Sequence, residues 1–594
     1  MSPAPGAPGR PRTVAPGRAA SRLPRRAATA LAMASALAVL LAGCAPATNP
    51  DWTPPQPTTG QAASIARPAD GSPSAPQAAG TLDPASVPGL SPQRLQSQRA
   101  GIGARWTYLP GGNAHAATFN ERLDAVVQSA IDDQRAHAGT PKYAPAAQPK
   151  GSGLGDRGCT SGASTRDAAA ILGDPASAPQ GAGGPVTALV CDVVVAGGTF
   201  FGERIRIVEG TPGAVTRDTA TTIVTDTATG ELVEGRALFT PDAAAGVYAL
   251  AVAALRHEAG ALWDVRLAPP SPAALDAVDR ALDAAFIGPD GSLQLAVPGS
   301  IDAPELASLA GAAALAAQPS IRLSLPAGAS SGFLTPFAQR LAAAAAAPYA
   351  GPADVAAAFD RVNCALVPCV ALTFDDGPEA DTTGRLLDTL AQHGAAASFF
   401  LVGRNVAAGA DLIRREQAEG HTIGTHTWSH PMLTTLGTTQ TPAPAPTPTG
   451  TPGPSGSPPP APADHGPSAV MQEVTRAIDA VAAITGSRPV WFRPPYGDVN
   501  DSVLRDLARV GVPAIDWDVD TNDWQKPGTD AIVSAAATAD AGSIILMHDI
   551  HATSVDAVPA VLDALADRGM VPVTLDHLFG GRVPAAGTVV RSAR

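Results

Sequence analysis

The chain has 594 residues, a formal net charge of −13, and 59 residues each of glycine and proline. This length exceeds what one hydrophobic core usually organises, so we expect several domains joined by linkers. Only 16% of the residues are charged and 4% are aromatic, which favours globular parts separated by Ala/Pro/Ser-rich segments. A negatively charged surface repels phosphate backbones, so we expect no nucleic-acid partner.

The first 43 residues have the pattern of an export signal. Arginines up to Arg26 precede an apolar run, 27–42, that is short for a membrane span. The run closes on Leu41-Ala42-Gly43-Cys44, which resembles a bacterial lipobox, so we expect Cys44 to be acylated and to begin the mature protein. An ordinary signal peptide that contains a cysteine is the alternative. We therefore expect an exported protein attached to the membrane only by its lipid.

Composition divides the rest of the chain into several parts. Residues 44–98 are rich in Pro, Ala and Ser, which predicts a disordered tether that lets the folded part reach the cell wall. Residues 99–352 mix helical and strand patterns, which predicts an α+β accessory domain of unknown role, such as a spacer or wall-binding module. The last domain covers 364–580, and 581–594 form a tail.

Export also favours disulfide bonds between the cysteines that follow Cys44. They are Cys159, Cys191, Cys364 and Cys369, for which three pairings are possible. We favour Cys159 with Cys191 and the remaining two with each other, because the second pair is close in sequence and directly precedes a predicted strand. A four-cysteine metal site is a weaker alternative, since neither pair has CxxC spacing.

Residues 364–580 alternate short β-branched runs with helical patterns, which is typical of a parallel (β/α) barrel. The predicted strands are 370–374, 397–402, 422–425, 490–492, 514–519, 543–547 and 571–574. The predicted helices are 383–393, 411–419, 468–484, 501–510, 531–539 and 555–567. In this architecture functional residues lie at the carboxyl ends of the strands.

A proline-rich insertion, 438–467, interrupts the barrel pattern and cannot continue a helix. We expect it to be a solvent loop, because long loops add little closure entropy. A second hypothesis is that it restricts the access of long glycans, since it follows closely on His430.

Polar residues that could carry chemistry follow two of the predicted strands. Asp375 and Asp376 end the first strand in an Asp-Asp-Gly-Pro turn. His426 and His430 follow the third strand at i, i+4 spacing, which places both rings on one face of a helical turn. Two histidines and one aspartate form a facial triad suited to Zn²⁺ or a similar divalent ion.

Three more strand ends carry polar or aromatic residues in the pairs Arg493 and Tyr496, Asp523 and Trp524, and Leu546 and His548. Taken singly, each pair fits an ordinary turn or a structural histidine. Together and in this order, the five motifs closely resemble those of the polysaccharide deacetylases, the NodB-homology or carbohydrate esterase family 4 enzymes. The resemblance extends over 364–580 and implies a distorted (β/α) barrel of the NodB-homology type.

The resemblance also implies roles for single residues. Asp376, His426 and His430 would bind a divalent metal, usually zinc. Asp375 would be the general base that activates water, and His548 the general acid that protonates the departing sugar amine.

The other implied roles are supporting ones: orientation of the base by Arg493, tuning of the acid by Asp523, an oxyanion contact from the Tyr496 backbone N–H, and an acetyl pocket walled by Trp524 and Leu546.

The function that the resemblance implies is hydrolysis of carbon–nitrogen bonds other than peptide bonds. We expect a metal-dependent enzyme that removes N-acetyl groups from N-acetylglucosamine-type residues of a cell-surface polysaccharide, and the tether favours peptidoglycan. One alternative is an O-acetyl xylan esterase of the same fold, because the same attack cleaves esters. Another is a non-catalytic wall-binding lipoprotein, although intact residues at all five motifs argue against it.

Overall fold

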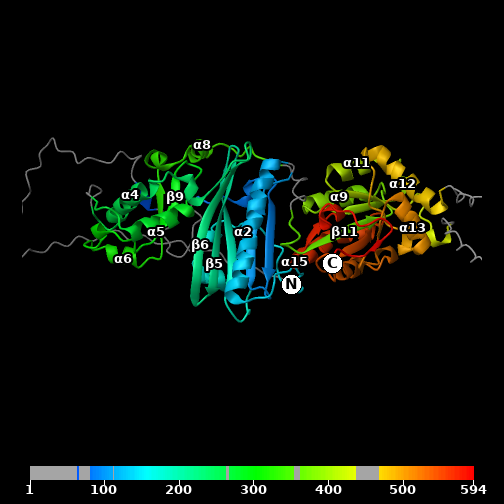
Figure 1. Cartoon of the computed structure of the whole chain (residues 1–594), viewed down its shortest axis with the longest axis horizontal. Helices are drawn as coiled ribbons and strands as arrows, with labels where there is room; N and C mark the ends of the chain where they lie inside the picture. The colour runs from blue at the N-terminus through cyan, green and yellow to red at the C-terminus, as the bar shows by residue number, and fades with distance from the viewer. Residues whose placement is uncertain (1–62, 66–79, 112, 262–266, 354–361, 437–466) are drawn as a thin grey trace, which may run out of the picture. The chain divides into compact units, whose positions relative to one another are not determined.

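The computed structural model describes residues 63–65, 80–111, 113–261, 267–353, 362–436 and 467–594 (Figure 1). They all belong to one compact unit, Gly60–Arg594. The expected signal peptide 1–43, the expected lipidation site Cys44 and nearly all of the insertion 438–467 lie outside the described residues. No helix in the described part of the chain has the length and hydropathy needed to cross a membrane.

The C-terminal region is a mixed α/β domain built on a parallel sheet. The strands lie in the order β13-β12-β11-β16-β15, and β17 pairs with the first half of β11. Their bounds are β11 (Cys369–Asp375), β12 (Ser398–Leu401), β13 (Thr422–Thr425), β15 (Val519–Asp520), β16 (Ile544–His548) and β17 (Val571–Val573). These positions confirm the predicted strands with two exceptions. Of 490–492 only Phe492 forms a bridge, and the single strand predicted at 514–519 is wrong, because it is divided into two short strands, β14 (Ala514–Ile515) and β15.

The two edge strands of this sheet, β13 and β15, are connected through the segment 492–515. Thr425, the last residue of β13, bridges Phe492, whose carbonyl accepts a hydrogen bond from the N–H of Ile515 in β14 (Ala514–Ile515). The chain then runs from β14 into β15, which pairs with β16. β18 (Val589–Val590), from the segment expected to be a tail, pairs in parallel with β14. These contacts connect the two edge strands of the sheet, β13 and β15.

The predicted helices of this region are present. They are α9 (Thr383–Gln392), α11 (Ala410–Ala418), α12 (Ala469–Thr485), α13 (Asp501–Val510), α14 (Thr529–Ala536) and α15 (Ala552–Asp567), with shorter α10 (Gly403–Val406) and α16 (Leu575–Leu578). A side-chain cap fixes where α12 begins, since the hydroxyl of Ser468 accepts from the N–H of Met471. α12 ends at Gly486, which takes the left-handed conformation that terminates many helices. The apolar faces of α9, α14 and α15 share one core with β11, β12 and β16.

The N-terminal region is rich in β structure, and its described residues form two sheets. One has the order β2-β3-β4-β5-β6-β7, and α2 (Ala114–Ala138) packs against it (Figure 1). Its strands are β2 (Ser91–Ser97), β3 (Ile102–Tyr108), β4 (Val186–Gly197), β5 (Phe200–Thr211), β6 (Ala214–Asp226) and β7 (Leu232–Glu234). The other sheet, β1-β10-β9-β8, shares a core with α4 and α5. Its strands and helices are β1 (Ser64–Ile65), β8 (Phe286–Ile287), β9 (Leu293–Val297), β10 (Ile321–Leu325), α4 (Ala243–Glu258) and α5 (Pro272–Asp283).

The folded part begins earlier than composition indicated. β1 and β2 both lie within 44–98, which we expected to be a disordered tether. β2 pairs along its whole length with β3, and its buried Arg94 donates hydrogen bonds to backbone carbonyls within 153–176. Hydrogen bonds to the backbone stabilise β2 although the strand is short and polar. The average composition of 44–98 therefore does not reveal this strand.

The four cysteines after Cys44 form two disulfide bonds, Cys159–Cys191 and Cys364–Cys369. The second bond joins the chain that enters the C-terminal sheet to the first residue of β11. Because all four sulfur atoms are paired in this way, none is a thiolate available to a metal ion.

Candidate metal centre and active site

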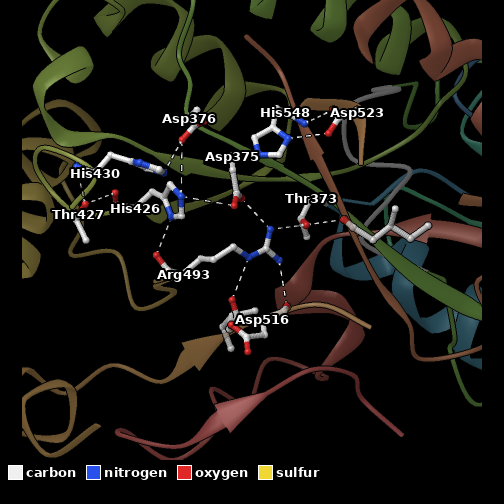
Figure 2. Close-up of polar contacts among 12 residues, drawn as sticks. Thr373, Asp375, Asp376, His426, Thr427, His430, Arg493, Asp516, Asp523 and His548 are labelled. Carbon is white, nitrogen blue, oxygen red and sulfur yellow. Dashed lines mark hydrogen bonds and ion pairs between the residues drawn. The ribbon is translucent and has the colours of Figure 1, made fainter. Parts of the chain in front are cut away.

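Three side chains with potential metal ligands meet at the carboxyl end of the parallel sheet (Figure 2). Asp376 follows β11, whereas His426 and His430 lie in the loop after β13. Nε2 of His430 lies 3.2 Å from Oδ1 of Asp376, and Nε2 of His426 lies 3.7 Å from the same oxygen. One candidate ligand atom from each residue lies within 4.8 Å of the other two. The structure thus brings the predicted metal-ligating residues together.

The backbone at Asp376 explains how two adjacent carboxylates serve one site. Neighbouring residues of a regular strand point to opposite faces. Asp376 leaves the extended conformation and adopts a φ of 76°, in the left-handed region. As a result His426 Nε2 lies 3.7 Å from a carboxylate oxygen of both Asp375 and Asp376.

The donor set fits a divalent cation. His426 Nδ1 lies 2.7 Å from the backbone carbonyl of Arg493, so Nδ1 carries the proton and Nε2 presents its lone pair toward Asp376. Burial, opposed by the charge of Asp376, lowers the pKa of His426 to about 3, which keeps the ring in the neutral form that binds metals. Oδ1 of Asp376 is buried and accepts no hydrogen bond within the described residues. A cation would satisfy this oxygen.

Asp375, the predicted general base, is the last residue of β11 and is almost completely buried. Its Oδ1 accepts a hydrogen bond of 2.8 Å from Nη1 of Arg493 (Figure 2). Burial raises the pKa of Asp375 above its usual value, although the positive charges of Arg493 and His548 oppose the shift. A carboxylate with a raised pKa is a stronger base than one in water, as proton abstraction near neutral pH requires.

Arg493 is itself fully buried, and its guanidinium is held on several sides. Besides Asp375 it donates to the hydroxyl of Thr373 at 2.8 Å, to the carbonyl of Ile515 at 3.0 Å and to the carbonyl of Asp516 at 3.3 Å. Because planar N–H donors in a rigid fork fix the direction of the acceptor, Arg493 is placed to orient the carboxylate of Asp375.

His548, the predicted general acid, ends β16 and faces Asp523. Its Nδ1 lies 2.7 Å from Oδ1 of Asp523, and its backbone N–H donates to Oδ2 of the same carboxylate at 2.7 Å. Burial would lower the pKa of His548, but the hydrogen bond and charge of Asp523, together with the charges of Asp375 and Asp376, outweigh it and raise the pKa to about 9. The ring is therefore an imidazolium at neutral pH and can donate a proton from Nε2.

The remaining predicted residues lie around this centre. Tyr496 has a φ of 64°, and its ring, 64% exposed, meets the His430 ring edge-on at 4.8 Å between centroids. The side chain of Tyr496 therefore lies beside a proposed metal ligand, and the oxyanion contact from its backbone N–H stays a prediction. Leu546 is buried within β16, whereas Trp524 follows Asp523 directly and is 56% exposed. An acetyl pocket walled by Leu546 and Trp524 stays a prediction.

Some residues of the site were missed from the sequence. Thr373 shares a strand face with Asp375, two residues later, and that alternation was a usable signal. Asp516 contributes its backbone carbonyl to Arg493, which no side-chain pattern reports. Glu473, which binds the loop between the two histidines, lies inside an ordinary amphipathic helix and gave no signal.

Comparison with known proteins gives a consistent result for this region. Residues 363–515 match the sequence pattern of the family described as polysaccharide deacetylase. The chitooligosaccharide deacetylase of Sinorhizobium fredii is 34% identical over 218 residues, which are 34% of this chain and 88% of that protein.

Two similar proteins are named for peptidoglycan. The peptidoglycan-N-acetylglucosamine deacetylase PgdA of Listeria monocytogenes is 35% identical over 215 residues, 36% of this chain and 39% of that protein. The peptidoglycan-N-acetylmuramic acid deacetylase PdaC of Bacillus subtilis is 33% identical over 210 residues, 35% of this chain and 38% of that protein. The matched part of the chain thus spans about two fifths of the length of these relatives.

Replacing His426 by Ala should remove bound metal. The variant loses one of three protein ligands and leaves Asp376 without its nearest buried partner, so we expect the zinc dissociation constant to rise at least about 100-fold. Metal content after dialysis and competition with a chromophoric chelator measure this. The matched control is His393→Ala, since His393 is an exposed histidine at the end of α9. Wild-type zinc retention in His426→Ala would contradict the ligand assignment.

Proposed function

Because the chain belongs to the polysaccharide deacetylase family, we propose that it is a metal-dependent hydrolase that removes N-acetyl groups from N-acetylglucosamine-type residues of peptidoglycan. We further propose that it is exported and anchored through a lipid on Cys44. The observation that supports the proposed activity is the meeting, at the carboxyl end of the parallel sheet, of three side chains that could hold a metal ion, the buried carboxylate of Asp375 and the imidazole of His548 paired with Asp523.

The base side of the proposed reaction belongs to Asp375. Asp376, His426 and His430 would hold the metal, which when bound supplies a Lewis acid for the acetyl carbonyl and makes nearby water more acidic. Asp375 accepts a proton from the attacking water, whose oxygen forms a bond to the carbonyl carbon. Arg493 keeps the carboxylate of Asp375 aimed at this water through its 2.8 Å hydrogen bond.

The acid side belongs to His548. Asp375 and His548 are direct register partners across β11 and β16, so base and acid flank the same point of the sheet edge. As the carbon–nitrogen bond breaks, His548 gives its Nε2 proton to the sugar nitrogen, and Asp523 stabilises the charged ring until that transfer. The products are acetate and the free amine. The backbone N–H of Tyr496 is the proposed donor to the oxyanion of the intermediate.

The choice of peptidoglycan rests on two supports. Two relatives of the catalytic region are named for peptidoglycan, although they differ in the sugar and are matched over less than half their length. The arginine-rich start and the Leu41-Ala42-Gly43-Cys44 sequence favour a position on the outside of a membrane, where the wall is the nearest polysaccharide.

Acetate release from three substrates tests the proposal. The purified protein is incubated with peptidoglycan, chitooligosaccharide and acetylated xylan, with and without a chelator, followed by added zinc. We expect release from peptidoglycan that the chelator stops and zinc restores. Release from xylan alone would instead favour an O-acetyl esterase, and the absence of release from all three substrates would contradict the proposed activity.

Replacing Asp375 by Asn should distinguish a role as general base from a role as metal ligand. The amide keeps an oxygen for Arg493 but cannot accept the proton from water, so we expect kcat to fall by about 10²- to 10⁴-fold while zinc stays bound. Metal analysis measures the retained zinc, and acetate release from the same sample measures the fall in kcat. Loss of zinc in this variant would show that the roles of Asp375 and Asp376 are reversed.

Replacing Asp523 by Asn should move the alkaline limb of the pH profile. His548 must be protonated to donate, so this group gives kcat/KM an alkaline limb, which falls as the pH rises above its pKa of about 9. Asn removes the negative charge that raises this pKa, so we expect the alkaline limb to move to lower pH by at least about one unit. An alkaline limb at the wild-type pH would contradict the assignment of His548 as the acid.

A further inference from the structure

A carboxylate on helix α12 holds the loop that carries two of the proposed metal ligands, residues 426–430. Glu473 Oε2 accepts hydrogen bonds from the backbone N–H of Trp428 at 3.1 Å and of Ser429 at 2.8 Å. Its other oxygen, Oε1, accepts from the hydroxyl of Ser429 at 3.0 Å. One carboxylate side chain thus satisfies three donors on two consecutive loop residues, and such hydrogen bonds to a carboxylate are stronger than those between neutral groups.

The loop has a conformation that needs such contacts. Thr427 and His430 both have a φ of 63°, a region that residues other than glycine occupy only when surrounding contacts fix them. Within the loop, the hydroxyl of Thr427 accepts from the N–H of His430 at 3.0 Å and donates to the carbonyl of His426 at 2.6 Å (Figure 2). These bonds close the turn around Thr427, and Glu473 binds the N–H groups of the two residues between Thr427 and His430.

The side chain of Trp428 is fixed from the same helix. The guanidinium carbon of Arg476, one turn after Glu473, lies 3.6 Å from the centroid of the Trp428 ring, a cation–π contact. On the backbone, the carbonyl of Trp428 accepts from the N–H of Arg404 at 3.0 Å. The ring also lies against Gly403, where an added Cβ would come within 2.8 Å of it. Helices α10 and α12 therefore hold the middle of the loop.

We propose that Glu473 is a positioning residue of the metal centre. It fixes the backbone of 426–430 so that the Nε2 atoms of His426 and His430 converge on Asp376 before a metal binds. Without this contact the loop must be ordered at the moment of binding, and the cost of ordering it lowers metal affinity. The inference rests on the metal assignment in the proposed function, and it concerns a residue that acts through the loop backbone.

Zinc affinity of Glu473→Ala tests the inference, with Asp479→Asn as the matched control. Asp479 is an exposed acidic residue on the same helix, so its replacement makes the same change in net charge away from the loop. By competition with a chromophoric chelator we expect the zinc dissociation constant to rise about 10- to 100-fold in Glu473→Ala and to stay at the wild-type value in Asp479→Asn. The rise in melting temperature on adding zinc should shrink only in Glu473→Ala, whereas a merely structural role would leave that rise unchanged.

A second variant covers the case in which Glu473→Ala does not fold. Glu473→Gln keeps an acceptor oxygen but loses the charge, so we expect a zinc affinity between those of the wild type and the alanine variant. Wild-type affinity in the folded variant of either kind would overturn the inference. Measuring His426→Ala in the same assay separates the metal assignment from the role of Glu473. If His426→Ala binds zinc weakly while the Glu473 variants bind it like the wild type, only the role of Glu473 is refuted. Wild-type affinity in His426→Ala would contradict the metal assignment and, with it, this inference.

Discussion

The contacts of Arg493 connect the proposed base to the proposed metal centre. Its guanidinium, fully buried, donates to the carboxylate of Asp375, while its backbone carbonyl lies 2.7 Å from Nδ1 of His426. A buried guanidinium is costly unless its N–H groups find acceptors, and here the segment 515–516 supplies two carbonyls. The direction of the proposed base and the tautomer of a proposed metal ligand therefore both depend on Arg493. Its backbone N–H donates to the carbonyl of Thr425 in β13, and its side chain donates to the carbonyl of Ile515 in β14.

The two histidines that flank the base show how environment sets chemistry. His426 is fully enclosed, and burial dominates its pKa, so the ring stays neutral and can bind a metal. His548 is also largely buried, but Asp523 bonds both its ring and its backbone N–H, which keeps the ring protonated. One residue type would thus supply both the proposed metal ligand and the proposed acid, because His426 has a carbonyl partner and His548 a carboxylate.

The sequence was most informative where pattern and chemistry coincide. The strand ending at Asp375 and the strand ending at His548 were predicted within a residue or two, because β-branched runs bounded by polar turns are a local signal. The pairing of His426 with His430 followed from their i, i+4 spacing, and the choice of Asp376 as the third ligand followed from the resemblance to a family. β2 was missed because its stability comes from pairing with β3, a contact that composition does not carry.

Contacts between residues far apart in the chain could not be predicted from the sequence. Glu473 binds residues more than forty positions earlier in the chain, and the carbonyls that hold Arg493 come from the backbone, which has the same chemistry at every position. The left-handed conformations of Asp376 and Tyr496 are likewise set by their surroundings, since neither residue type favours them strongly.

Anomalous diffraction from crystals of the zinc-loaded protein, measured on both sides of the zinc absorption edge, tests the central claim most directly. The account predicts one strong peak about 2.0–2.2 Å from Oδ1 of Asp376 and from Nε2 of His426 and of His430. A peak at other ligands, or none at these three atoms in protein that binds zinc, would contradict it.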